Sequence, residues 1–192
     1  MQIQPLAIPD ILLIIPIKRH DERGFFSETS RRDVLAAAGV TEEFIQDNHV
    51  YSAKRGVLRG LHFQTPPHAQ GKLVRCTRGA ILDIAVDIRK GSPTYGQHAA
   101  AELSAENWHQ LWIPAGFAHG YVTLESHSEV IYKVTDYWHP ACERGIAWND
   151  PELAIEWGIS TADAIVANKD RTNPRLSELE SFFDFVPRTL GP

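Results

Sequence analysis

The length, composition and charge of the chain already exclude several classes of protein. It has 192 residues, of which 43% are hydrophobic and 22% charged, and this is typical of a single globular domain with a substantial core. The formal net charge of −5 lacks the basic footprint of a nucleic-acid-binding protein. Cys76 and Cys142 lie far apart and form no CxxC pair, so neither a disulfide framework nor a zinc ribbon is indicated.

The first apolar segment covers residues 11–17 and is interrupted by Pro16. It is much shorter than the roughly 20 residues of a membrane-spanning helix. Basic residues follow this segment, whereas in a secretory signal they precede it. We therefore expect no membrane association and a cytoplasmic location.

One helix is predicted near the N-terminus, over residues 31–38 (RRDVLAAA). Ser30 is suited to cap its first turn, and Gly39 to end it. The rest of the first two thirds of the chain reads as short strands separated by Gly, Pro and Asn turns. The expected strands cover residues 44–51, 57–65, 72–77, 81–89, 110–113, 117–124 and 130–136.

Many short strands without helical segments between them predict an all-β fold, either a sandwich or a barrel. The alternation is clearest over residues 81–89, where Leu82 and Ile84 share one face and Asp83 and Asp87 the other. Pro151, Pro174 and Pro187 divide the remainder of the chain into short segments. We expect residues 150–192 to wrap around the β core within a single domain spanning residues 1–192.

Polar residues are concentrated in residues 56–64 (GVLRGLHFQ), which are followed closely by Gln70 and Lys72. Strict alternation would place Arg59 and His62 on opposite faces of this strand. A charged Arg59 on an apolar face would be costly unless it were paired or reached a ligand. A β-bulge at Gly60 would turn both side chains toward one cavity, and this is our prediction. The alternative for His62 is a core histidine hydrogen-bonded to the backbone.

The nine histidines of the chain also suggest metal ligation. His62 and His68 flank a Pro-Pro turn, and His119 follows a Pro-Ala-Gly turn. Metal-binding β-barrels often present two histidines one residue apart, and the sequence contains no His-x-His. A metal-dependent barrel remains an alternative, but we expect no metal.

Several longer motifs follow one another along the chain. They are DxRGxFxE over residues 21–28, QDN over 46–48, GVLRGLHFQ over 56–64, QGKLV over 70–74, VDIRKGSPTYG over 86–96, PAGFAHGY over 114–121, YKVTDYW over 132–138 and ERGIAWNDP over 143–151. In content, order and spacing the chain resembles the dTDP-4-dehydrorhamnose 3,5-epimerase family from about residue 1 to residue 180. The resemblance implies a cupin-type jelly-roll fold.

The resemblance also implies roles for individual residues. His62 would be the general base and Asp170 its partner, Tyr132 the proton donor on the opposite face of the sugar, and Lys72 the cation that stabilises an enolate oxygen. No cofactor and no metal would be required. Substrate binding is implied for Arg23, Phe26, Glu28, Gln46, Asn48, Arg59, His119, Trp138, Glu143 and Lys169.

The implied substrate explains why these residue types are needed. A ketone at C4 of the hexose acidifies the hydrogens at C3 and C5 when the developing enolate is stabilised, and a fixed ammonium does this well. A base with a pKa near neutrality removes the proton. Because inversion requires a new proton from the other face, base and acid must be different groups, as His62 and Tyr132 are.

The implied function is therefore inversion of dTDP-4-dehydro-6-deoxy-D-glucose at C3 and C5, which feeds dTDP-rhamnose synthesis. The resemblance further implies a homodimer that exchanges N-terminal strands, about residues 1–30, so that Arg23 and Glu28 contribute to the neighbouring pocket. Besides the metal-dependent barrel, three alternatives remain open at this point. They are an epimerase that inverts only C3, a sugar-nucleotide ketoisomerase, and a sugar-binding cupin without catalysis.

Overall fold

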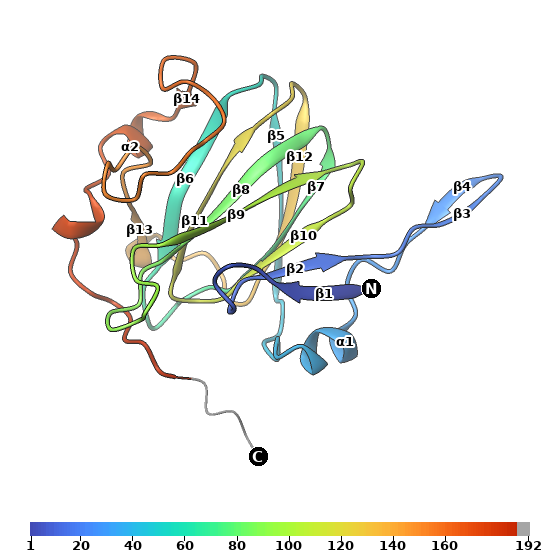
Figure 1. The fold of residues 1–192 in the computed structure, drawn as a ribbon, viewed down its shortest axis with the longest axis horizontal. Helices are drawn as coiled ribbons and strands as arrows, with labels where there is room; N and C mark the ends of the chain where they lie inside the picture. The colour runs from blue at the N-terminus through green and yellow to red at the C-terminus, as the bar shows by residue number, and fades with distance from the viewer. Residues whose placement is uncertain (188–192) are drawn as a thin grey trace.

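The computed structural model describes residues 1–187, and its strands form two facing sheets of six strands each (Figure 1). In order across the first sheet, the strands are β1 (Gln2–Pro5), β2 (Leu12–Ile15), β10 (Gln110–Ile113), β7 (Lys72–Arg78), β12 (Ser128–Val134) and β5 (Gln46–Ser52). The second sheet contains β13 (Glu143–Gly145), β6 (Val57–Gln64), β11 (Phe117–Thr123), β8 (Ala80–Asp87) and β9 (His98–Ser104), with β14 (Ile165–Val166) parallel to β6.

Helical structure is limited to short pieces. They are α1 (Arg32–Ala37), α2 (Asn168–Arg171) and the 3-10 turns η1 (Pro140–Cys142) and η2 (Leu176–Glu178). The predicted all-β fold of the cupin-type jelly roll is thus confirmed. No helix among residues 1–187 is both long and apolar enough to cross a membrane.

The predicted strands are present with boundaries within two residues of the prediction. Strands in residues 1–30 were implied only by the resemblance, and β9, β13 and β14 were not predicted. The segment of β9 (HAAAELS) is rich in alanine, which has a low preference for strands. The prediction for the helix was partly wrong. It begins at Arg32, with Arg31 as its N-cap and no side-chain cap, so Ser30 lies one position too early to cap it. Gly39 does end the helix, with a φ of +89°.

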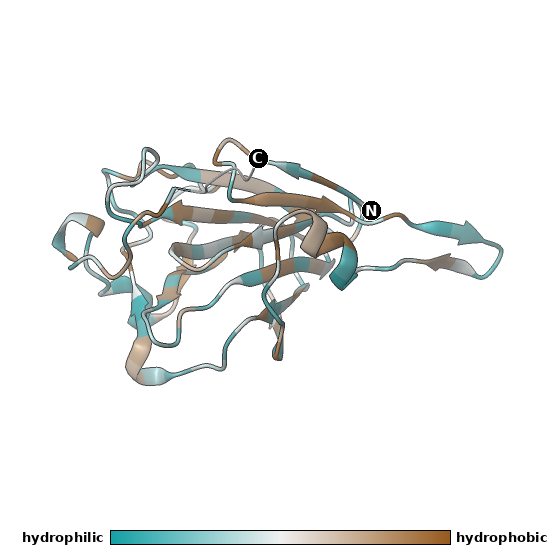
Figure 2. Ribbon diagram, turned by 90° about the horizontal axis from the view of Figure 1, so that it is seen from below, coloured by the Kyte–Doolittle hydropathy of each residue, from teal (hydrophilic) through white to brown (hydrophobic). Residues whose placement is uncertain are grey.

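The two sheets enclose the main hydrophobic core, and each also packs on its outer face. Ile81, Leu103, Leu111 and Phe117 are among the side chains buried between the sheets. On the outside of the first sheet, Leu35 of α1 belongs to a cluster with Trp112 and neighbouring side chains. Figure 2 shows the corresponding hydrophobic segments in the stacked strands.

The outer face of the second sheet is covered by the C-terminal part of the chain. Trp148, Trp157 and Leu176 pack there against Leu61 and Val86. Both faces of β8 are consequently buried, and its aspartates point into the space between the sheets. Asp83 and Asp87 are completely buried. The last five residues of the predicted wrap, 188–192, lie outside the described residues.

A two-stranded hairpin, β3 (Arg19–Asp21) and β4 (Gly24–Phe26), projects away from the sheets (Figure 1). All of its strand residues are exposed, including the large side chains of Phe25 and Phe26. By contrast, β1 and β2 pair within their own chain, with β2 next to β10. Within residues 1–30 the hairpin is therefore the part that projects from the sheets, and Phe25 contacts Trp108 of its own chain edge to face, with ring centroids 5.1 Å apart.

Candidate active site

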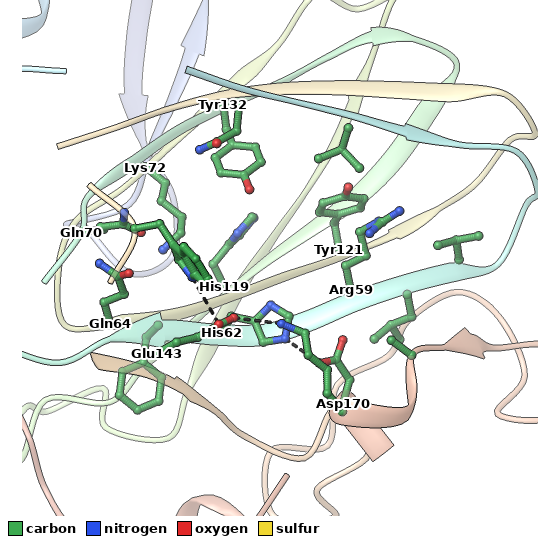
Figure 3. A pocket seen from close by; sticks show the side chains of 18 of the residues that line it. Arg59, His62, Gln64, Gln70, Lys72, His119, Tyr121, Tyr132, Glu143 and Asp170 are labelled. Atoms are coloured by element: carbon green, nitrogen blue, oxygen red, sulfur yellow. Dashed lines mark hydrogen bonds and ion pairs between the residues drawn. The ribbon is translucent and has the colours of Figure 1, made fainter. Parts of the chain in front are cut away.

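A cavity of about 510 Å³ opens between the two sheets. Its walls come from β5, β6, β7, β11 and β12, and the segment from β14 to α2 closes one side. Figure 3 shows His62 and Tyr132 facing each other across this cavity, with Lys72 to one side. Trp138 and Glu143 also line the cavity, which therefore brings together residues from seven separate stretches of the sequence.

The irregular course of β6 determines which of its side chains enter the cavity. His62 pairs with His119, whereas Arg59 pairs with Tyr121, so three steps along β6 match two steps along β11. This extra residue is the predicted bulge, and it lies at Gly60, whose φ of +129° suits only glycine. As a result both Arg59 and His62 line the cavity.

The imidazole of His62 is held by a carboxylate. Its Nε2 lies 2.7 Å from Oδ1 of Asp170, a residue of α2 that is 3% exposed. The backbone N–H of Gly60 donates to the other oxygen of Asp170 at 3.4 Å. Burial favours the neutral acid, but the interactions with His62, the N–H of Gly60 and Lys169 together outweigh it and hold the pKa of Asp170 below its usual value. This pair orients the ring and leaves Nδ1 with a lone pair.

Lys72 is a buried cation at the start of β7, 8% exposed. Burial lowers its pKa to about 8, although the negative charges of Glu143 and Asp83 act in the opposite direction. Within residues 1–187 its ammonium group makes no hydrogen bond to the protein. The group is therefore available to a negative charge that develops in the cavity.

Tyr132 comes from β12, in the sheet opposite β6. Burial raises the pKa of its hydroxyl, so that the phenol remains protonated at neutral pH. A protonated phenol facing an imidazole that can accept a proton provides an acid and a base on opposite sides of one space.

A second histidine–aspartate pair lies deeper between the sheets. Nε2 of His119 is 2.7 Å from Oδ1 of Asp83, and both residues are buried. Asp83 also contributes to the electrostatic environment of Lys72. Burial raises the pKa of Asp83, against the opposing effect of His119 and Lys72. Its other oxygen, Oδ2, has no hydrogen-bond partner among residues 1–187, and the ionised carboxylate adds negative potential close to the buried cation.

Polar and aromatic side chains surround the cavity at the end of β6. Glu143 accepts hydrogen bonds from Nζ of Lys169 at 2.9 Å and from Nε1 of Trp138 at 3.2 Å. Burial opposes ionisation of Glu143, but the interactions with Lys169, Trp138 and His62 together outweigh it and lower the pKa of the carboxyl. Gln46 donates to Asn48 at 2.9 Å on β5. Trp138 is exposed, so its ring is available to a flat ligand group.

Most of the predicted site residues line this one cavity, namely His62, Lys72, Tyr132, Asp170, Gln46, Asn48, Arg59, His119, Trp138, Glu143 and Lys169. Three predicted residues do not. Arg23 and Phe26 lie in the projecting hairpin and Glu28 follows it, where they are exposed or partly exposed. Within one chain the hairpin points away from the two sheets (Figure 1), whereas the cavity lies between them.

The sequence analysis did not identify several cavity residues. Tyr121, Gln64 and Gln70 all line the cavity, and Asp83 supports it through His119. The alternation of strands contained a signal for two of them. Tyr121 is two residues from His119, and Gln64 is two residues from His62, so each shares a face with a residue that was identified.

One group of possible metal ligands lies outside the cavity lining. Atoms of His68, Asp136 and His139 lie within 4.8 Å of one another, and Nδ1 of His68 is 3.1 Å from Asp136. The two imidazole rings are stacked, with centroids 3.4 Å apart and an angle of 13° between the planes. Lone pairs lie in the plane of each ring, so parallel rings do not direct their nitrogens to a common point. The rings would have to turn before both could bind one ion.

Comparison with known proteins places these observations in a family. A family model described as dTDP-4-dehydrorhamnose 3,5-epimerase matches residues 5–178. The chain is 51% identical over 183 residues to the dTDP-4-dehydrorhamnose 3,5-epimerase of Pseudomonas aeruginosa, covering 95% of this chain and 99% of that protein. It is 37% identical over 162 residues to the dTDP-4-dehydrorhamnose 3-epimerase of Streptomyces niveus, and the match covers 84% of this chain and 78% of that protein.

A solved structure agrees with the sequence relatives. The dTDP-6-deoxy-D-glucose-3,5-epimerase of Legionella pneumophila, in complex with dTDP-4-keto-L-rhamnose, superposes with a TM-score of 0.92 at 40% identity. The match covers 97% of this chain and 99% of that one. Sequence and fold therefore agree over nearly the whole length, and the chain belongs to the dTDP-4-dehydrorhamnose 3,5-epimerase family.

Proposed function

We propose that the protein epimerises dTDP-4-dehydro-6-deoxy-D-glucose at C3 and C5 to give dTDP-4-dehydro-L-rhamnose. The observation that carries this proposal is the arrangement of His62 and Tyr132 on opposite sides of a cavity that also contains the buried cation of Lys72. A sugar-binding protein without catalysis needs no such opposed acid and base. The 51% identity to the Pseudomonas aeruginosa enzyme supports the same reaction.

The first step is removal of a proton next to the C4 ketone. Nδ1 of His62 accepts the proton, while Asp170, hydrogen-bonded to Nε2, stabilises the imidazolium that forms. The electron pair of the broken C–H bond moves onto the C4 oxygen and creates an enolate. Lys72 stabilises this oxygen by its charge, at a position from which water is largely excluded.

The second step returns a proton to the same carbon from the opposite face. The hydroxyl of Tyr132 donates it, and the enolate collapses to the ketone with the carbon inverted. The tyrosine oxygen then regains a proton from solvent and His62 releases its own, so that the catalyst is unchanged. The same two groups would act on C3 and on C5 in turn.

The nucleotide part of the substrate would bind along the exposed side of the cavity. Arg59 and Lys169 are cations at this edge and suit the diphosphate, and Trp138 offers an exposed aromatic face for stacking on the base. Lys169 is already paired with Glu143, so this pair would open or share its contacts when the diphosphate binds. Gln46 and Asn48 provide hydrogen-bonding groups nearby.

The projecting hairpin suggests that the site is completed by a second copy of the chain. Phe26 is 64% exposed and Arg23 is largely exposed, and a cation and an aromatic ring are groups that a nucleotide diphosphate binds. We propose a homodimer in which the hairpin of each subunit, with Arg23, Phe26 and Glu28, reaches the cavity of its partner.

The reaction is tested by incubating the keto sugar with the protein in D₂O and locating deuterium in the sugar. We expect deuterium at both C3 and C5 together with inversion. Exchange at C3 alone would instead support the 3-epimerase activity named for the Streptomyces niveus relative. Movement of the keto group without inversion would support a ketoisomerase.

Two variants identify the groups that carry the protons. His62→Ala should lose exchange by about 10²-fold or more, since no base remains. Tyr132→Phe should still exchange deuterium but should invert poorly, because only the face of His62 can be reprotonated. Full exchange and inversion by His62→Ala would contradict the assignment of the base.

A further inference from the structure

A second tyrosine in the cavity has no role in the reaction described above. Tyr121 lies on β11, where it pairs with Arg59 of β6 and Asp83 of β8. Its side chain faces inward, belongs to the core between the sheets and lines the cavity. Figure 3 shows its ring next to Arg59, at the edge of the space into which Tyr132 points.

The hydroxyl of Tyr121 is buried and has no hydrogen-bond partner within the described part of the chain, residues 1–187. The residue is 3% exposed, so water provides little compensation for the missing bond. A buried hydroxyl without a partner is unfavourable for folding, and phenylalanine would fill the same space without this cost. The hydroxyl is thus poorly explained by the packing of the free protein.

The surroundings of the hydroxyl indicate what kind of group it would meet. Arg59 contributes a positive charge close to it, and burial keeps the phenol protonated by raising its pKa. A neutral donor beside a guanidinium matches an acceptor oxygen, and an anionic oxygen best of all. Such oxygens are present on both the diphosphate and the hexose of a nucleotide sugar.

We propose that the Tyr121 hydroxyl donates a hydrogen bond to an oxygen atom of the bound nucleotide sugar and is a further substrate-binding residue of this site. The inference rests on the proposed function, because that function defines the ligand. Tyr121 differs from Tyr132 in that it transfers no proton. It adds a directed contact next to Arg59, on the inner side of the cavity.

The test is Tyr121→Phe, which removes only the hydroxyl. The dissociation constants of dTDP and of dTDP-glucose are measured by calorimetry for the variant and the natural protein. We expect the dissociation constant of the variant to be about tenfold higher than that of the natural protein, which corresponds to the loss of one hydrogen bond. A rise for both ligands places the acceptor on the diphosphate, and a rise for dTDP-glucose alone places it on the hexose. Tyr95→Phe is the matched control, since Tyr95 is exposed and outside the cavity.

Thermal denaturation separates this role from a structural one. Without ligand, Tyr121→Phe should melt at the same temperature as the natural protein or higher, because an unpaired buried hydroxyl is removed. With dTDP-glucose, its stabilisation should be smaller than that of the natural protein. Unchanged affinity for both ligands would show the inference to be wrong. If the natural protein itself neither binds these ligands nor epimerises the keto sugar, the proposed function fails instead.

Discussion

At the scale of single residues, the buried ammonium of Lys72 connects the environment of the cavity to the pH dependence of the reaction. Burial alone would favour the neutral amine of Lys72, whereas the negative charges of Glu143 and Asp83 favour its ammonium form. The enolate forms on a neutral ketone, so a cation at this position interacts far more strongly with the transition state than with the substrate. In the proposed reaction, the protonated form of Lys72 is therefore the active one.

The pKa of Lys72, about 8, predicts the alkaline limit of activity. The ammonium of the free protein is present below this value and is lost as the pH rises through it, so kcat/KM should fall above about pH 8. Tyr132 does not cause this decrease, because its pKa is raised. In Lys72→Arg the rate should be lower overall, but the decrease near pH 8 should be absent, since guanidinium remains charged. An unchanged alkaline limb in this variant would contradict the assignment.

At the scale of elements, the bulge in β6 positions Arg59 and His62 in the candidate active site. It turns Arg59 and His62 to the same side, and the backbone of Gly60 donates to Asp170. A side chain at Gly60 has no room. A Cβ atom there would lie 2.5 Å from Cα of Gly120 and 2.8 Å from the carbonyl oxygen of His119. The close approach of β6 and β11 therefore depends on glycine.

We expect Gly60→Ala to lower the free energy of unfolding by roughly 2–4 kcal/mol, from backbone strain and steric overlap together. Urea denaturation measures this change. Gly91→Ala is the matched control, because Gly91 also has a positive φ, +81°, but a Cβ atom there would have no neighbour within 4 Å. In this control the free energy of unfolding should decrease by only about 1–2 kcal/mol. Equal losses in the two variants would argue against the close packing at the bulge.

At the scale of the whole molecule, the proposed homodimer would bring the hairpin of one subunit to the cavity of the other. The hairpin points away from the two sheets of its own chain, whereas β1 and β2 are paired within that chain (Figure 1). A dimer in which the hairpins are exchanged would bury Phe26 and would place Arg23 near the diphosphate of the partner. Each active site would then contain residues from two chains.

Complementation between two defective variants tests this arrangement. His62→Ala removes the base, and Arg23→Ala removes the proposed contribution of the hairpin. In a mixed dimer, one of the two sites receives an intact cavity and an intact hairpin. Co-expression of the two chains should therefore restore about a quarter of the natural activity, measured as conversion of the keto sugar. Activity no higher than the mean of the two separate variants would mean that the hairpin acts elsewhere.

The sequence by itself was sufficient to predict most of the local structure of this protein. The alternation of apolar residues predicted most strands of the two sheets, and the glycine in GVLRGLHFQ predicted the bulge that turns Arg59 and His62 together. The residues of the cavity were found through motifs that keep their order along the chain. Predictions of this kind succeed because strand periodicity and glycine conformations depend on neighbouring residues.

The remaining features were decided by the tertiary structure. Asp170 lies 108 residues from His62 in the sequence, and only the segment that packs on the second sheet brings the two together. The role proposed for Tyr121 rests on a hydroxyl that is buried without a partner among residues 1–187. Long-range pairing and burial of this kind result from the whole fold, since they are set by contacts between distant segments that no local pattern encodes.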